Sequence, residues 1–199
     1  MSTIVGNVYD KYHTRNPIAQ WLMRQFLRSL RNLYATAQAT SVLEVGCGET
    51  WLSQHLLATA PIRPQRFVAC DLALDQAIEN RDPLIELQQA DIYQLPFADS
   101  SFDLVICCEV LEHLEQPKFA LQELRRVCGN FVLISTPWEP VWRILNIIRG
   151  RYLINWGNTP GHIQHFSRKQ LFDLVRQQFE IIERKTPLPW TVILARPQL

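Results

Sequence analysis

The first regular pattern along the chain is helical. Apolar side chains recur at steps of three and four residues after Pro17, a residue type favoured in the first turn of a helix. The apolar members are Ile18, Trp21, Leu22, Phe26, Leu30, Leu33 and Ala37, with Arg24, Arg28 and Arg31 among them. This spacing predicts an amphipathic helix that packs one face on a core.

Beyond this helix, short apolar runs alternate with helical segments. The pattern predicts strands at residues 41–47, 66–71, 85–91, 102–110 and 131–136, and helices at 51–58, 74–80 and 119–127. The run Phe102–Val110 is nearly all apolar, as expected of a strand buried on both faces. Strands and helices that alternate at this spacing form βαβ units, which predict a parallel sheet covered by helices on both faces.

The C-terminal part of the chain follows another pattern. Ser167 and Gln170 have the spacing of a capping box, which predicts a helix through Gln177. Strands follow at 179–185 and 190–196, and the short loop between them predicts an antiparallel pair. The expected fold is α/β: a Rossmann-like, doubly wound sheet of seven strands, mostly parallel, with an antiparallel C-terminal strand pair. No repeat or second domain is evident, so residues 1–199 are treated as one domain.

Composition and charge narrow the class of protein. The 199 residues are 47% hydrophobic, which suits one domain with a substantial core. A formal net charge of +1 lacks the basic excess of a dedicated nucleic-acid binder. No apolar run is long enough to span a membrane and no signal peptide is evident, so the expected location is the cytoplasm. The five cysteines lack C-x-x-C spacing and are expected to be reduced core residues.

The turn after the first predicted strand carries candidate chemistry. The segment Glu44-Val45-Gly46-Cys47-Gly48-Glu49-Thr50 leads from a buried strand into Gly-x-Gly. In doubly wound sheets, ligands bind beyond the carboxyl ends of the strands. The third glycine of a dinucleotide fingerprint is missing here, and the acid Glu44 does not suit a pyrophosphate. A nicotinamide-dependent oxidoreductase is therefore disfavoured, whereas an acid at this turn suits a ligand that carries an ammonium and a sulfonium group.

Two further acids end predicted strands. Asp71 closes the second strand and Asp91 closes the third. Any one acid after a strand is also explained as a helix N-cap. Together with Glu44, however, they place three acids at one edge of the predicted sheet. Three such positions favour a ligand over three independent caps.

In order and spacing, these motifs resemble those of class I S-adenosylmethionine-dependent methyltransferases, over residues 40–136. The run Glu109-Val110-Leu111-Glu112-His113-Leu114 resembles the small-molecule methyltransferases that include quinone-biosynthesis enzymes. The resemblance implies S-adenosyl-L-methionine as cofactor and S-adenosyl-L-homocysteine as product. It places at the cofactor Glu44, Gly46, Cys47, Gly48, Asp71, Leu72, Asp91, Ile92 and Glu109.

The same resemblance implies individual contacts. The acid matching Asp71 binds both ribose hydroxyls, the acid matching Asp91 accepts from the adenine amino group, and the backbone N–H of Ile92 meets a ring nitrogen. The sequence departs from the family pattern at two places. Thr50 replaces the usual third glycine, and the usual Pro-Gly-Gly turn is reduced to residues 128–130.

His113 is the best candidate for a general base, because it follows the fourth strand at the cofactor edge. The alternative is a histidine at a helix start, bonded to backbone. Glu109, Glu112 and His113, with His162 or His165, also form a set suited to a divalent ion, as in metal-assisted O-methyltransferases. The same motif occurs in relatives that use no metal, so the identity of any metal stays unknown and a metal is not favoured.

The segment 138–166 is rich in aromatic and apolar residues interspersed with arginines. The simpler interpretation is an inserted helix on the core, and the alternative is an amphipathic element at a membrane, with peripheral contact through residues 138–156. Its likeness to the insertion of quinone-ring O-methyltransferases implies a hydrophobic or lipid-linked acceptor. The segment Tyr9–His13, within the N-terminal region 1–38, resembles a lid over the cofactor.

The favoured function is S-adenosylmethionine-dependent methyl transfer to a small or lipid-linked acceptor, with oxygen preferred over nitrogen or carbon. Two alternatives stay open. One is a non-catalytic methyltransferase-like binding protein, which the loss of a glycine at Thr50 slightly supports. The other is an RNA 2′-O-methyltransferase, which the near-neutral charge disfavours.

Overall fold

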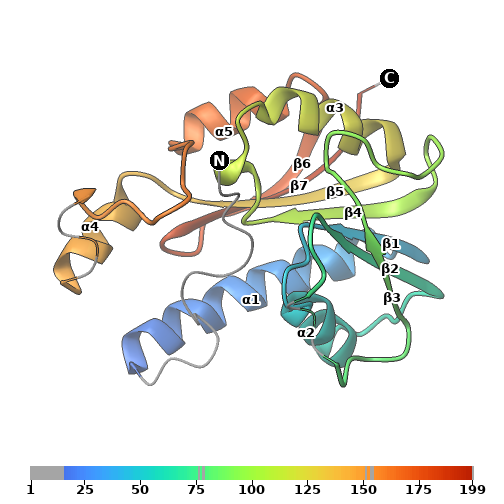
Figure 1. Cartoon of the computed structure of the whole chain (residues 1–199), viewed down its shortest axis with the longest axis horizontal. Coiled ribbons are helices and arrows are strands. Elements are labelled where there is room, and N and C mark those ends of the chain that lie inside the picture. The colour runs from blue at the N-terminus through green and yellow to red at the C-terminus, as the bar shows by residue number, and fades with distance from the viewer. Residues whose placement is uncertain (1–15, 76, 78, 151, 153–154, 199) are drawn as a thin grey trace.

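The structure is a computed structural model that describes residues 16–75, 77, 79–150, 152 and 155–198 (Figure 1). The lid expected at Tyr9–His13 lies outside these residues. In chain order the elements are α1 (Pro17–Ala37), β1 (Ser41–Val45), α2 (Trp51–Thr59), β2 (Arg66–Asp71), β3 (Ile85–Gln89), β4 (Phe102–Cys108), the short 3-10 helix η1 (Leu111–His113), α3 (Pro117–Val127), β5 (Cys128–Pro137), α4 (Val141–Ile148), α5 (Arg168–Val175), β6 (Phe179–Lys185) and β7 (Trp190–Pro197).

One sheet of seven strands organises the molecule, in the order β3-β2-β1-β4-β5-β7-β6. Strands β1 to β5 pair in parallel, whereas β7 is antiparallel to both β5 and β6. This confirms the predicted mostly parallel sheet with an antiparallel C-terminal pair. The strand order reverses between β1 and β4, so the carboxyl ends of these two strands flank the position where doubly wound folds bind ligands.

Helices cover both faces of the sheet, with α1 and α2 on one side and α3 and α5 on the other (Figure 1). Strand β4 shows why. Leu104 and Ile106 pack into the core on the α1 side, and Val105 and Cys107 pack into the core on the α3 side. Successive side chains of a strand point to opposite faces, so an unbroken apolar run fills both cores. All five cysteines are free, and only Cys108 is partly exposed, which confirms their predicted core role.

The helix ends follow local signals. Asn16 caps α1 by accepting hydrogen bonds from the backbone N–H groups of Ile18 and Ala19. The predicted capping box of Ser167 and Gln170 is present at the start of α5. That helix ends at Val175, two residues before the predicted end.

Two predictions between β2 and β4 were wrong. No helix is found among the described residues of 74–80, where the turn bond from Ala77 N to Leu74 O is present instead. Seven residues are too few for a helix without strong tertiary packing. Strand β3 ends at Gln89, so Asp91 lies in a turn, where it forms an isolated bridge with Gln94.

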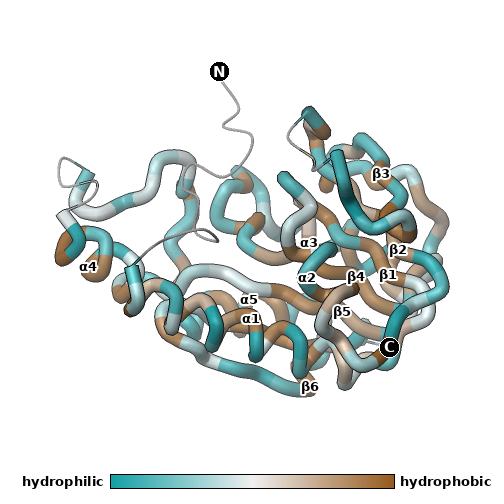
Figure 2. The backbone as a smooth tube through the Cα atoms, turned by 90° about the horizontal axis from the view of Figure 1, so that it is seen from below, coloured by the Kyte–Doolittle hydropathy of each residue, from teal (hydrophilic) through white to brown (hydrophobic). Residues whose placement is uncertain are grey.

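The insertion contains a helix, α4, which projects from the body of the molecule at one end (Figure 1). It is strongly hydrophobic (Figure 2), and Trp142 is its residue that packs against the core on the α1 side. Asn146, the buried residue of this helix, donates a hydrogen bond of 2.9 Å to Gly157 O and so fastens α4 to its own return segment. In the part of the chain that the structure describes, no helix has the length and hydropathy to cross a membrane.

Candidate functional site

The turn after β1 is tight on one side and open on the other. The backbone N–H groups of Gly46 and Cys47 both donate to Cys70 O, at 2.8 and 3.0 Å. Gly46 has φ +78°, and a Cβ there would lie 2.3 Å from Val110 Cγ2, so only glycine fits. At Gly48, with φ +48°, a Cβ would meet no atom within 4 Å. The outer side of Gly48 therefore has room for a ligand that approaches the backbone.

Thr50 keeps the shape of this turn without the third glycine. Its φ of +61° lies in the left-handed region, which is rare for a β-branched residue, and its side chain is buried. Its hydroxyl donates to Glu49 O at 2.6 Å and makes no cap to α2. The backbone thus accepts a strained residue where the family pattern has glycine.

Glu44 is buried within β1, with 3% of its surface exposed. Ser53, on α2, donates a hydroxyl hydrogen bond to the Glu44 carboxylate. Burial raises the pKa of Glu44 to about 7, Ser53 acts against this rise, and the nearby charge of Asp71 adds to it. The charge of this carboxyl group therefore responds readily to a cation placed beside it.

Asp71 connects the end of β2 to the glycine turn. One carboxylate oxygen accepts from Gly48 N at 2.8 Å, and the other accepts from Leu72 N at 2.7 Å. A carboxylate has about four acceptor positions, so capacity for further hydrogen bonds remains. The structure thus brings together Asp71, Leu72 and the turn residue Gly48, as the sequence predicted for one binding edge.

The Asp91 segment is shaped by a turn and held by α3. Asp91 Oδ1 accepts a hydrogen bond from Tyr93 N at 2.9 Å. Asp91 is exposed, whereas the next residue, Ile92, is buried. Arg126 fixes the loop that follows, because its guanidinium donates to Leu95 O and Phe97 O at 2.9 and 2.7 Å. Sequence reasoning did not identify Arg126, and its place in an amphipathic helix gave no signal.

Glu109 takes part in a cross-strand contact. Its carboxylate accepts from Ser135 Oγ on β5 at 2.9 Å and from Trp190 Nε1 on β7 at 2.8 Å. Its φ of +61° turns the chain sharply at the end of β4. In this structure Glu109 therefore joins three strands, a role that the sequence did not predict.

His113 is oriented by the insertion. Its Nδ1 lies 2.9 Å from Gly161 O. A carbonyl oxygen only accepts, so this bond places the proton on Nδ1 and the lone pair on Nε2. The segment that contains Gly161 is itself held, since Ile163 N and Gln164 N both donate to Glu112 O, at 3.0 and 2.9 Å. The sequence suggested either a backbone hydrogen bond or a role as base for His113, and the two are compatible because they use different nitrogen atoms.

Three residues of the predicted metal set come together. Glu112, His113 and His162 each place a ligand atom within 4.8 Å of the others, and the two imidazole rings meet edge to face at 4.9 Å. Trp142, on α4, stacks with His162 and so connects the insertion to this cluster. Glu109 makes the strand contacts given above, and His165 Nε2 lies 2.9 Å from Asn158 Oδ1. Among the described residues, neither of these two belongs to the cluster.

Comparison with known proteins shows a similarity to methyltransferases. Residues 43–130 match the family model described as a methyltransferase domain. A probable S-adenosylmethionine-dependent methyltransferase of Mycobacterium tuberculosis is 34% identical over 101 residues, which are 50% of this chain and 36% of that protein. Over residues 43–130 the chain is thus similar to the S-adenosylmethionine-dependent methyltransferases. It spans little more than a third of the length of this relative.

Two further methyltransferases are similar over more of the chain. A ubiquinone biosynthesis O-methyltransferase of Rickettsia bellii is 26% identical over 184 residues, covering 87% of this chain and 74% of that protein. The structure of the N-methyltransferase NodS from Bradyrhizobium japonicum, in complex with S-adenosyl-L-homocysteine, superposes with a TM-score of 0.69 at 16% identity. The match covers 96% of this chain and 94% of that structure, which confirms the methyltransferase fold.

Proposed function

We propose that the protein transfers a methyl group from S-adenosyl-L-methionine to an oxygen atom of a small or lipid-linked acceptor. The observation that carries this proposal is the binding edge formed by the turn at Gly46–Thr50 and the strand ends beside it. Glu44 and Asp71 lie on the neighbouring strands β1 and β2, and the bond from Gly48 N to Asp71 holds the turn against β2. This edge lies at the switch point, where the fold binds ligands.

The residues at this edge fit the chemical groups of the cofactor. The Glu44 carboxylate suits the ammonium group, the acceptor positions of Asp71 suit the ribose hydroxyls, and Asp91 with the N–H of Ile92 suits the adenine edge. The open side of Gly48 admits close approach to the backbone, beside Cys47 and Leu72. When bound, S-adenosyl-L-methionine supplies a methyl carbon on a positively charged sulfur that leaves as a neutral thioether.

His113 acts as the base in this proposal. As the acceptor oxygen forms its bond to the methyl carbon, its proton passes to Nε2, whose lone pair is set by the Nδ1 bond to Gly161 O. The remaining contribution of the protein is positioning and exclusion of water, because charge disappears as the sulfonium is consumed. His162 and Trp142 form part of the wall around His113 and come from the insertion.

The acceptor side supports a hydrophobic substrate. Helix α4 exposes Ile144, Ile147 and Ile148, and Trp156 on its return segment is 75% exposed. This apolar surface lies on the same helix as Trp142, which stacks with the His113 neighbour His162, and it suits a lipid-linked acceptor and peripheral contact with a membrane. One relative is named a ubiquinone biosynthesis O-methyltransferase, which supports phenolic and quinol lipids as the first acceptors to test.

The first test is calorimetric titration with S-adenosyl-L-homocysteine. We expect micromolar binding by the wild type and a loss of at least about tenfold in Asp71→Asn, because one of two charged acceptors for the ribose is removed. Asp173→Asn is the matched control, since Asp173 is an exposed aspartate on α5 that pairs with Lys169. Its affinity should equal that of the wild type. A folded wild type that binds no S-adenosyl-L-homocysteine would support the non-catalytic alternative and end the proposal.

A metal-assisted version of the same reaction is the second candidate. The cluster of Glu112, His113 and His162 offers a carboxylate and two imidazoles, and the bond from His113 to Gly161 O resembles the support that metal-bound histidines receive. Titration with Co²⁺, followed by its visible absorption spectrum, separates the two versions. If the wild type binds one Co²⁺ with a changed absorption spectrum, and His162→Gln does not, the metal-assisted version is favoured. If the spectrum with wild-type protein is that of free Co²⁺, the base alone is favoured.

A further inference from the structure

The outer face of α1 carries a stripe of residues that the methyl-transfer site does not use. Trp21, Arg24, Arg28 and Arg31 follow one another at steps of three and four residues, so they lie on one face of the helix. The buried residues of α1 lie on the opposite face, against the sheet: Met23, Phe26, Leu27, Leu30, Leu33, Tyr34 and Ala37. We call the outer face the arginine stripe.

The positive charge of this stripe is not balanced by ion pairs within the described part of the chain. No Asp or Glu occurs in α1. None of the ion pairs among the described residues includes an arginine of the stripe, whereas arginines elsewhere pair with acids. As far as the described residues go, this charge is available to an anionic partner.

Exposed apolar side chains accompany the stripe. Trp21 is 53% exposed, and Ile18, one turn earlier, is 70% exposed. The first turns of α1 also lie at the same end of the long axis as α4, to the left in Figure 1. That helix likewise lacks acidic residues and exposes isoleucines outward. One end of the molecule thus combines unbalanced arginines with tryptophan and isoleucine.

We propose that the arginine stripe docks the protein on an anionic phospholipid surface, with Trp21 and Ile18 at the interface. Arginines suit phosphate headgroups, and tryptophan prefers the boundary between headgroups and acyl chains. An acidic protein would satisfy the arginines but would leave the exposed isoleucines of both helices without an apolar environment, so a membrane fits better. This inference deepens the proposed function, because a lipid-linked acceptor would lie in the same surface.

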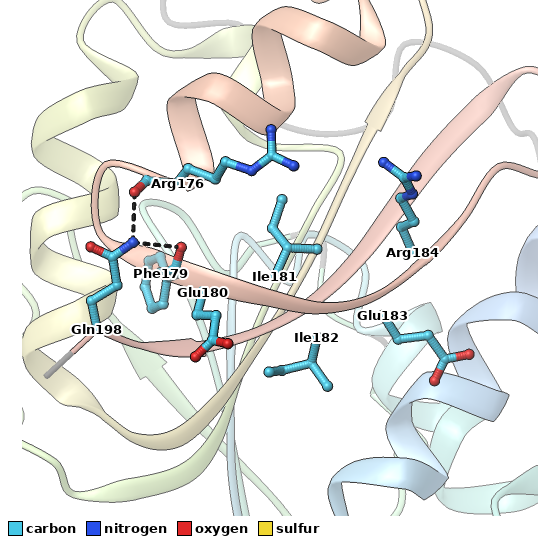
Figure 3. Close-up of a pocket in the computed structure, with 8 residues that line it drawn as sticks. All are labelled: Arg176, Phe179, Glu180, Ile181, Ile182, Glu183, Arg184 and Gln198. Atoms are coloured by element: carbon cyan, nitrogen blue, oxygen red, sulfur yellow. Dashed lines mark hydrogen bonds between the residues drawn. The ribbon is translucent and has the colours of Figure 1, made fainter.

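The test compares vesicle binding by the full chain and two double variants. Vesicles of phosphatidylcholine, with and without about 30% phosphatidylglycerol, are sedimented with protein at low salt. Arg24→Gln with Arg28→Gln should weaken binding to anionic vesicles about 30-fold, since each basic residue near such a surface contributes about fivefold. The control is Arg176→Gln with Arg184→Gln, two exposed arginines beside the open groove along β6 (Figure 3). This control should stay within about twofold of the wild type.

Two results would overturn the inference: a wild type indifferent to phosphatidylglycerol, or equal losses in both double variants. Binding to polyglutamate but not to vesicles, lost in the Arg24 and Arg28 variant, would point to an acidic protein instead and also overturn it. Titration with S-adenosyl-L-homocysteine separates this question from the proposed function. Intact binding in the stripe variant shows that it is folded, whereas a wild type that fails to bind S-adenosyl-L-homocysteine counts against methyl transfer alone.

Discussion

At the scale of single residues, we expect Glu44 to make cofactor binding sensitive to pH. Its pKa is raised to about 7, chiefly because burial disfavours the ionised form. An ammonium group beside this carboxylate favours ionisation. We therefore expect the affinity for S-adenosyl-L-homocysteine, measured by calorimetry, to rise between about pH 6 and about pH 8 in the wild type and to be flat in Glu44→Gln. A parallel rise in both proteins would contradict this role.

The same pKa has a consequence for stability. An unfolded glutamate ionises near 4.5, whereas Glu44 in the native state holds its proton until about pH 7. Between these two pH values the native state binds one more proton than the unfolded state. The contribution of Glu44 to the free energy of unfolding therefore falls as pH rises, and it becomes constant above about pH 7. Across this pH window, we expect the free energy of unfolding measured in urea to rise for Glu44→Gln relative to the wild type. The reason is that glutamine keeps an acceptor for Ser53 and carries no charge.

At the scale of elements, α3 sets the conformation of the loop between β3 and β4 through Arg126. The guanidinium binds Leu95 O, Phe97 O, Asp99 and Glu123. We expect Arg126→Met to lower the melting temperature by several degrees and to weaken S-adenosyl-L-homocysteine binding severalfold, since this loop follows directly on Asp91 and Ile92. Arg125→Met is the control, because Arg125 is bonded to Gln198 O at the C-terminal end. Equal effects of both variants would reject a specific role for Arg126.

At the scale of the whole molecule, the two cores share the strands of one sheet. Neighbouring residues of β4, such as Leu104 and Val105, belong to opposite cores, so neither core forms without the other. We predict a single calorimetric unfolding transition, with the van't Hoff enthalpy close to the calorimetric enthalpy. Two separable transitions would show that the chain is not one folding unit.

Much of the fold could be predicted from local sequence patterns. The apolar runs fixed the strands of the parallel sheet, and the capping box at Ser167 marked the start of α5, because each signal depends on neighbours in the chain. The prediction of a helix at 74–80 was wrong because it also relied on local pattern alone. A segment of seven residues is too short for its local pattern to favour a helix over turns. The sequence also predicted that Glu44 and Asp71 lie at or near the ends of neighbouring strands, as they do in the structure, whereas their role at the cofactor stays a prediction.

By itself, then, the sequence determined the order of elements, the sheet and the glycine turn, and it predicted the similarity to methyltransferases. Only the tertiary structure decided which distant side chains meet. It set Glu109 against Ser135 and Trp190, brought His162 to His113 and Glu112, and left His165 outside that cluster. It also showed that, among the described residues, no acid forms an ion pair with Arg24, Arg28 or Arg31. These contacts join residues from separate elements, and their formation depends on packing that no local spacing encodes.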